Sequence, residues 1–164
     1  METEDSIYFY EQNKPYGWMS NFAVSNFVDA DGNNFSCSEQ YFMFVKAKTF
    51  EPTNNELLNQ ILNETKPDKI KKLGRDVKNY NENVWNAIRY DVMKAGLRLK
   101  FEQNIVLKNL LVGTGNKTLY EASKYDKIWG IGFYPPDAIN ADKKFFGHNL
   151  LGNALMDIRN EFRK

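Results

Sequence analysis

A chain of 164 residues fits one domain and is long enough to bury a substantial hydrophobic core. Its 22 lysine and arginine residues nearly balance its 21 aspartate and glutamate residues, so no overall field draws it to nucleic acid or to a membrane surface. One cysteine, Cys37, and one histidine exclude an intramolecular disulfide framework and a tetrahedral Cys/His zinc site.

The chain begins with a short acidic stretch, Met1–Ser6, which lacks the basic and then apolar pattern of a secretory leader. No apolar run approaches the ~20 residues of a membrane-spanning helix. A lone cysteine is typical of a reducing compartment. We therefore expect a cytoplasmic protein that forms a single domain over residues 1–164.

Short strands are predicted early in the chain, at Ser6–Tyr10 and within Phe22–Phe35. Asp29–Asn33 has the composition of a hairpin turn between two such strands. A helix follows, which starts near Ser36 and ends before Pro52.

Helices dominate the rest of the chain. They are predicted at Asn54–Asn63, from a capped start at Thr65–Asp68 to Gly74, at Asn81–Phe101, at Ile105–Leu111 and at Asn149–Phe162. A brief strand fits Thr118–Glu121, whereas Ser123–Gly147 is expected to be long and irregular, a type of segment that is usually functional. These elements predict a helix-dominated α+β fold with a few short strands.

The first long helix carries the most informative face of the sequence. Glu39, Phe42, Met43 and Lys46 follow at the spacing that places side chains on one side of an α-helix. An ionisable pair on so apolar a face is costly unless it is satisfied or used, which makes Glu39 and Lys46 the first candidates for chemistry.

Each of these two residues also has a purely structural interpretation. Ser36 and Glu39 match the S-x-x-E capping box, in which the glutamate returns to the amide at the start of the helix. Lys46 can extend its amine outward to water. If its amine is held inside instead, desolvation lowers the pKa of Lys46 and frees a nucleophile.

Three further places offer groups for a ligand. Arg75 follows Gly74 in a basic cluster, where a guanidinium fork can clamp a phosphate, although a solvated helix face is the alternative. Asp126 is suited to a ribose hydroxyl, and Trp129 beside Gly130 is either an exposed stacking ring or an anchor of its loop. The amides at Gly147–Asn149, at the start of the last helix, are candidates for an anion.

Short motifs occur in a characteristic order along nearly the whole chain, from about Ile7 to Arg159. In order, they are Ser20–Phe22, Ser38–Phe42 with Lys46, Leu73–Arg75, Trp85, Val92–Ala95, Lys100–Asn104, Leu119–Ser123, Asp126–Gly132 and Gly147–Arg159. Together they resemble the YbiA-like, or NADAR, family. Gln40, where many relatives have His, departs from the pattern, as does the Phe44-Val45 pair, and both bear on substrate preference more than on activity.

The resemblance implies the YbiA-like fold and an N-glycosidase, which hydrolyses the bond between ribose C1′ and a nitrogen without a metal or redox cofactor. The resemblance implies one of two substrate classes. One is ADP-ribose linked to guanine in nucleic acid, and the other is phosphorylated ribosylaminopyrimidine intermediates of riboflavin synthesis. The implied partner is therefore a small nucleotide-like substrate or ADP-ribosylated nucleic acid, with no membrane.

The resemblance also implies roles for particular residues. Lys46 attacks C1′ or forms a Schiff base with the ring-opened sugar, Glu39 positions that amine and moves protons, and Asp126 holds ribose hydroxyls. The expected substrate-binding residues are Ser20, Asn21, Phe22, Arg75, Trp85, Trp129 and Gly130. The alternative is a non-catalytic module that binds ADP-ribose or a related nucleotide through the same contacts.

Overall fold

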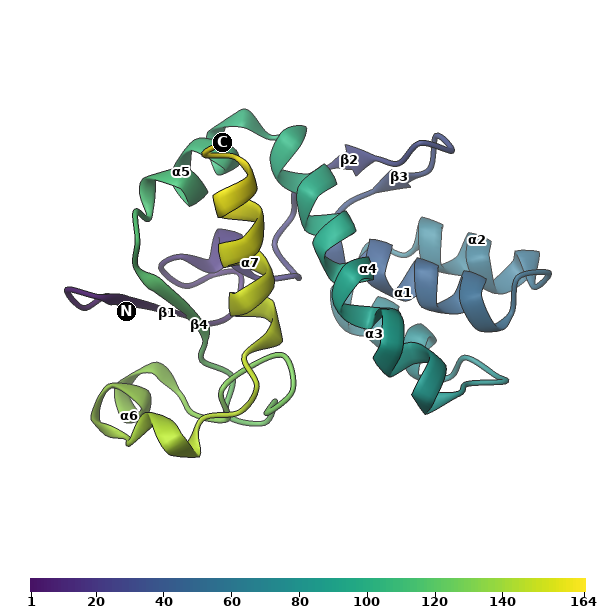
Figure 1. The fold of residues 1–164 in the computed structure, drawn as a ribbon. Coiled ribbons are helices and arrows are strands. Elements are labelled where there is room, and N and C mark those ends of the chain that lie inside the picture. Colours follow the sequence, from purple (N-terminus) through teal and green to yellow (C-terminus); the bar gives the residue numbers. More distant parts are fainter. The chain divides into compact units, whose positions relative to one another are not determined.

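The computed structural model describes all of residues 1–164, and the chain divides into two units (Figure 1). The first unit consists of residues 1–23 and 105–164, and the second of residues 24–104. The helix-dominated α+β fold is confirmed, whereas a single domain over 1–164 stays a prediction. No helix combines the length and apolar character needed to cross a bilayer.

The first unit is built on two parallel strands that are far apart in sequence. Strand β1 (Ser6–Phe9) pairs with β4 (Thr118–Glu121), with Ser6 opposite Thr118. Parallel strands need a long crossover, and here the whole second unit is part of the connection between them. The other elements of this unit are the 3-10 helices η1 (Gly17–Met19) and η2 (Lys143–Phe145), α5 (Ile105–Gly113), α6 (Pro135–Asn140) and α7 (Leu150–Glu161).

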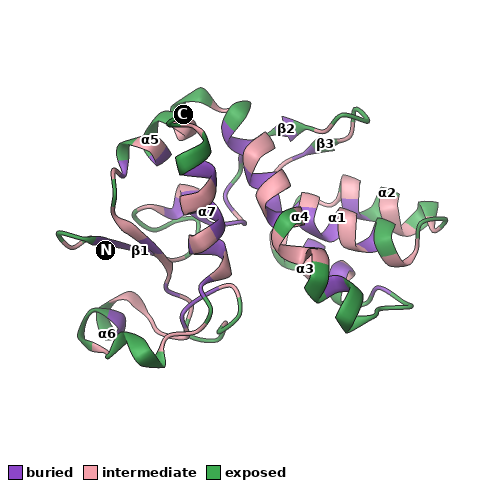
Figure 2. Cartoon of the chain, in the orientation of Figure 1, coloured by how far each residue is buried: buried purple, intermediate pink, exposed green.

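Helix α7 packs on β4 and completes the core of the first unit. Gly152 allows this close approach, because a Cβ there would overlap the carbonyl oxygen of Leu119. Leu151, Leu155 and Ile158 of α7 are fully buried. Figure 2 shows the contrast with α6, which is mostly exposed.

The second unit consists of a hairpin and four helices. Strands β2 (Phe27–Val28) and β3 (Asn34–Phe35) pair antiparallel around the predicted turn. The helices are α1 (Ser38–Phe50), α2 (Asn55–Asn63), α3 (Pro67–Arg75) and α4 (Glu82–Glu102). α1 contacts each of the other three helices, which explains why most of its surface is apolar.

Three predictions about the elements were wrong in detail. Ser123–Gly147 is not wholly irregular, since α6 starts at two prolines, which fix helical φ and lack only amides that would be unpaired in the first turn. The start of α3 has no side-chain cap, and Lys66 occupies its N-cap position. Gly74 lies inside α3 instead of ending it. The absence of a side chain at Gly74 leaves room for Met43 of α1.

Candidate functional site

The predicted face of α1 forms as the spacing indicates. Glu39, Phe42 and Met43 are all buried, and Glu39 is only 7% exposed. Lys46, one turn further along, is half-buried. A carboxylate and an amine are thus held on one mostly apolar face, about two turns apart.

The capping-box interpretation of Glu39 was wrong. Helix α1 starts one residue later than that motif requires, with Cys37 at the N-cap and no side-chain cap. The amide of Ser36 donates to Gln40 Oε1 at 2.7 Å, and the Ser36 hydroxyl donates to the same oxygen at 3.0 Å. The residue that returns to Ser36 is therefore Gln40, not Glu39.

Burial and neighbouring charges set the basicity of Lys46. Burial lowers the pKa of the Lys46 amine, the charge of Glu39 opposes that shift, and the charge of Arg75 adds to it. The Lys46 Nζ lies 4.7 Å from the centroid of the Tyr80 ring. The amine is therefore partly desolvated, which is what a nucleophilic lysine requires.

Trp85 supports this face from within the fold. It is 5% exposed, and its ring centroid lies 5.0 Å from that of Phe42 and 6.2 Å from that of Phe50. Phe50 in turn contacts Tyr80 edge-on at 5.3 Å. This aromatic cluster backs the α1 face, so Trp85 acts on it through Phe42.

Arg75 is carried to this region by the packing of α3 on α1. A Cβ at Gly74 would overlap the sulfur of Met43, so the two helices approach this closely without a shift of the Met43 side chain only because residue 74 is glycine. Arg75 is the last residue of α3, and its side chain is exposed. An exposed guanidinium beside a half-buried amine is suited to an anionic ligand.

Asp126 and Trp129 lie in a loop of the first unit. One oxygen of Asp126, Oδ1, accepts from the amides of Ile128 at 2.9 Å and Trp129 at 2.8 Å. Gly130 is buried, and a Cβ there would lie 2.9 Å from the carbonyl oxygens of Asp126 and Glu121. Asp126 therefore shapes the loop with one oxygen, and Gly130 is needed for its close backbone approach.

The anion site predicted at Gly147–Asn149 was wrong, because the amides there are already used. Those of residues 147–151 donate to carbonyl oxygens of residues 127–131. The Asn149 side chain links the start of α7 to β4, since Nδ2 donates to Leu119 O at 2.8 Å and Oδ1 accepts from the Glu121 amide at 3.0 Å. His148 is exposed.

The predicted substrate-binding residues Ser20, Asn21 and Phe22 follow η1 in the first unit. Ser20 and Asn21 are each 9% exposed, and the Ser20 hydroxyl oxygen accepts from the Phe22 amide at 3.2 Å. The turn is thus fixed by its own serine. Its role in binding stays a prediction.

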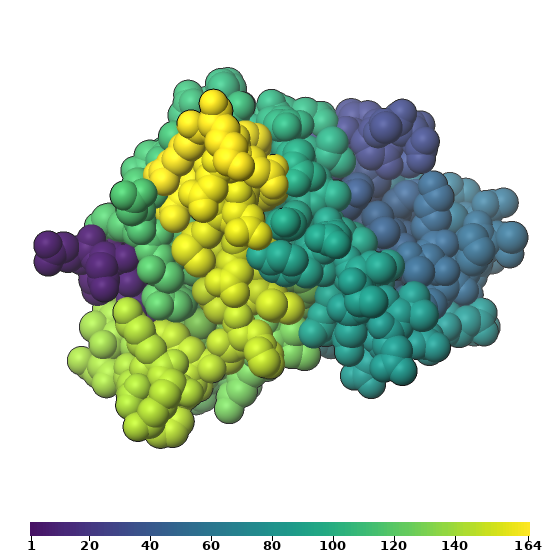
Figure 3. Space-filling view, viewed as in Figure 1, coloured from purple at the N-terminus to yellow at the C-terminus, as the bar shows by residue number.

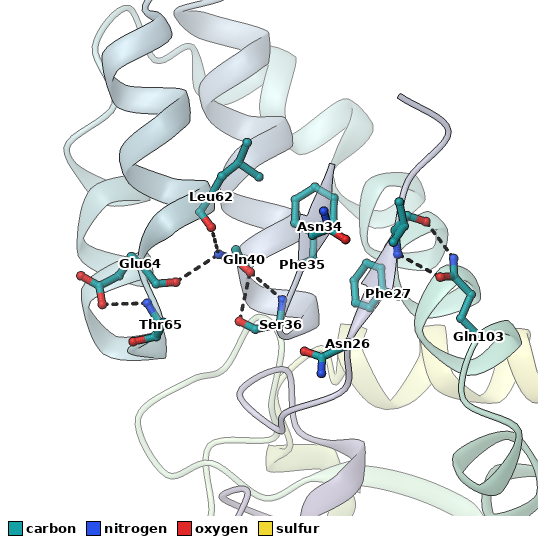
Figure 4. A pocket seen from close by; sticks show the side chains of 11 residues that line it. Asn26, Phe27, Asn34, Phe35, Ser36, Gln40, Leu62, Glu64, Thr65 and Gln103 are labelled. Atoms are coloured by element: carbon teal, nitrogen blue, oxygen red, sulfur yellow. Dashed lines mark hydrogen bonds between the residues drawn. The ribbon is translucent and has the colours of Figure 1, made fainter. Parts of the chain in front are cut away.

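Gln40 lines a hollow of about 380 Å³ in the second unit, which the sequence did not predict (Figure 4). Gln40 Nε2 donates to the carbonyl oxygens of Ile61, Leu62 and Glu64 at 2.8 to 3.1 Å. Gln40 thereby fastens the end of α2 to the start of α1. The residue that replaces His at this position therefore makes the hydrogen bonds that join α1 to the end of α2.

A buried amine was also missed. Lys100 is 0% exposed, and burial lowers its pKa to about 7, although the neighbouring Cys37 thiol opposes that shift. Burial likewise raises the pKa of Cys37. The signal was present in the sequence, because Met93, Leu97 and Lys100 share one face of a helix and the first two are core residues.

The second unit brings four of the predicted site residues into one neighbourhood: Glu39, Lys46, Arg75 and Trp85. The other predicted site residues, Ser20, Asn21, Phe22, Asp126, Trp129 and Gly130, belong to the first unit. No group of three or more histidine, cysteine, aspartate or glutamate side chains is arranged to hold a metal ion.

Comparisons with known proteins find relatives that match nearly the whole chain. The family model described as NADAR domain matches residues 8–163. N-glycosidase R617 of Acanthamoeba polyphaga mimivirus is 40% identical over 169 residues, which cover 98% of each chain. The riboflavin biosynthesis protein VVA0006 of Vibrio vulnificus is 30% identical over 161 residues, which cover 98% of this chain and 40% of that protein.

A relative of known structure matches this chain both in sequence and in fold. N-glycosidase YbiA of Escherichia coli is 31% identical over 155 residues, covering 94% of this chain and 87% of YbiA. Its solution structure matches with a TM-score of 0.77 and 30% identity, over 99% of this chain and 88% of that one.

Proposed function

Because the chain belongs to the NADAR domain family, we propose that it hydrolyses the ribose C1′–N bond of a phosphorylated N-riboside, with Lys46 as the nucleophile. The enzyme class predicted from the sequence, an N-glycosyl hydrolase, is confirmed by the relatives named N-glycosidase. The substrate and the residue roles are proposals. The observation that carries them is the half-buried Lys46 amine on the same face as buried Glu39.

In the first step the neutral Lys46 amine attacks C1′. The C1′–N bond breaks, its electron pair goes to the leaving nitrogen, and that nitrogen takes up a proton. The resulting sugar–lysine adduct opens to a Schiff base, with C1′ doubly bonded to Nζ and the ring oxygen protonated. Water then adds to C1′ and releases the free sugar and the amine.

Glu39 assists both halves of this reaction. As the nitrogen leaves, C1′ gains oxocarbenium character, which a buried carboxylate stabilises strongly because little water screens it. The same carboxyl group can donate the proton to the leaving nitrogen and later accept one from water. Its burial and the action of its charge on the Lys46 amine support this assignment.

Arg75 is our candidate for the substrate phosphate. Its exposed guanidinium lies at the end of α3, and its charge acts on Lys46. From the family resemblance we propose Asp126 for the ribose hydroxyls, Trp129 for the base and the Ser20-Asn21 turn for the phosphate. Each is tested by its own alanine variant.

Two substrates share the required chemistry. ADP-ribose linked to guanine and a ribosylaminopyrimidine phosphate both present an N-linked ribose near a phosphate. Incubation with each, followed by chromatography of the released base, is the direct test. We expect release from at least one substrate by the wild type and none by the Lys46→Ala variant.

A non-catalytic ADP-ribose-binding module predicts a different result. Calorimetry would then show ADP-ribose binding while no base is released from either substrate, and the Lys46→Ala variant would bind as the wild type does. That outcome would refute the proposed hydrolysis.

A further inference from the structure

A tyrosine-lined groove in the first unit lies outside the residues assigned above. We propose that it binds single-stranded nucleic acid by stacking bases on its rings, so that a modified guanine is taken as part of a strand. The proposal rests on the proposed function, because it selects the nucleic-acid substrate over the free nucleotide. The groove is the cavity of about 600 Å³ lined by Met1, Tyr8 of β1, Tyr10, the Lys14-Pro15 turn, Tyr134 and the first three residues of α6.

The rings of the groove are arranged as a stacking platform. Tyr10 and Tyr134 line the groove and meet edge to face with centroids 5.3 Å apart. Tyr125 lies next to the lining and meets Tyr134 in the same way at 6.3 Å. Tyr125 is 84% exposed. An exposed ring of this size is costly in water, and aromatic rings that present a free face are what single-stranded nucleic acids stack on.

Lysines lie where the phosphates of a stacked strand would pass. The Lys124 Nζ is 5.8 Å from the Tyr125 centroid and 5.6 Å from the Tyr134 centroid, while exposed Lys14 lines the groove itself. Cations interleaved with rings are the recurring composition of single-strand sites. Asp137, also in the lining, repels phosphate, so we expect the backbone to follow the Lys14 and Lys124 side.

The groove is lined by segments at the surface of the first unit. The segments that line it, the N-terminal residues and α6, lie side by side at the surface of the first unit (Figure 3). Tyr125 directly precedes Asp126, the residue proposed to hold ribose hydroxyls. A proline-rich peptide is the other ligand that tyrosine and proline rings accept. Such a peptide has no phosphate for Lys124, which lies over the Tyr125 and Tyr134 rings.

The test is fluorescence anisotropy with a labelled, unmodified 12-nucleotide single-stranded DNA at low salt. The variants are Tyr125→Ala, Tyr134→Ala and Lys124→Ala. Losing one base–ring stack corresponds to roughly 5- to 150-fold in affinity, so we expect at least about fivefold weaker binding by each tyrosine variant. Lys124→Ala should lower the slope of log affinity against log salt by about 0.7.

Phe145→Ala is the matched control, because Phe145 is a 62% exposed ring with the Lys144 Nζ 5.0 Å from its centroid. Phe145 is not part of the groove lining, and its ring is not among those that meet Tyr134, whereas Tyr125 meets Tyr134. Its affinity should equal that of the wild type. The proposal is overturned if the wild type does not bind DNA, if Tyr125→Ala binds like the wild type, or if a proline-rich peptide binds the groove instead.

Hydrolysis assays separate this proposal from the proposed function. The free ADP-ribosylated guanosine should be hydrolysed equally by wild type and Tyr125→Ala, whereas an oligonucleotide carrying the same base should show a raised KM with Tyr125→Ala. DNA binding without hydrolysis of any substrate contradicts the proposed function alone. Hydrolysis with an unchanged KM for the oligonucleotide contradicts the groove alone.

Discussion

Burial lowers the pKa of Lys46, and Glu39, two turns earlier on the same face of α1, opposes that shift. The two effects work against each other on one amine, and the charge of Arg75 acts in the same direction as burial. The reactivity of Lys46 is thus adjustable through single charges nearby. This relationship makes the proposed mechanism testable by pH profiles.

Glu39→Gln should shift the pH profile of hydrolysis. The reaction needs the neutral amine, so its rate rises with pH through the pKa of Lys46. Removing the Glu39 charge lowers that pKa further and moves the rising limb to lower pH, while loss of the proton-transferring group reduces maximal kcat by about 10²-fold or more. Glu56→Gln, at an exposed carboxylate of α2, should change neither. A rising limb that stays in place excludes this coupling.

Arg75→Gln should move the rising limb of the pH profile to higher pH. Removing the Arg75 charge raises the pKa of Lys46, so a higher pH is needed for the neutral amine. Loss of a phosphate contact should also raise KM by about tenfold. Lys72→Gln, one turn earlier on α3, is the control and should leave KM unchanged. An unchanged KM for Arg75→Gln would show that another group holds the phosphate.

Gly74→Ala should destabilise the second unit, because the new methyl group would overlap the sulfur of Met43. Overpacking of this kind costs about 1–3 kcal/mol in the free energy of unfolding, as measured by urea titration. Gly113→Ala is the matched control, since nothing lies near its Cβ position. Met43→Ala combined with Gly74→Ala should lose less stability than the sum of the two single variants. Additive losses would mean that the Gly74–Met43 contact is not the cause.

Lys100 should make stability depend on pH. Its pKa is about 7 in the folded chain and about 10.5 when exposed in the unfolded one, so between these values the unfolded state binds the extra proton. The wild type therefore gains stability relative to Lys100→Met as pH rises from 7 toward 10, by an amount on the order of a few kcal/mol. Urea titrations of both proteins at several pH values measure the difference. A difference that is constant with pH would show that the amine is not desolvated.

The sequence predicted most elements because their signals are local. The periodic apolar residues of α1, α4 and α7 and the turn residues between β2 and β3 are each contained in one stretch of chain. The face with Glu39 and Lys46 was predicted for the same reason. α6 was missed because a helix of only six residues, two of them prolines, has almost no periodic signal.

Contacts between segments that are distant in the sequence could not be predicted from it. Gln40, rather than Glu39, returns to Ser36 because its amide also meets three carbonyls at the end of α2, more than twenty residues away. The amides at Gly147–Asn149 are used by the loop of residues 127–131. Each of these partners is set by tertiary packing, which no short sequence pattern encodes.

The central claim is that the Lys46 amine bonds to the sugar during turnover. Sodium borohydride reduces a Schiff base to a stable secondary amine, so enzyme, substrate and borohydride together should give a protein with the mass of the reduced sugar added. Peptide mass spectrometry should place the adduct on Lys46. Lys48→Ala, at an exposed lysine of the same helix that pairs with Asp31, should be labelled like the wild type, and Lys46→Ala should not be labelled. An absence of adduct, together with turnover by Lys46→Ala, would contradict the claim.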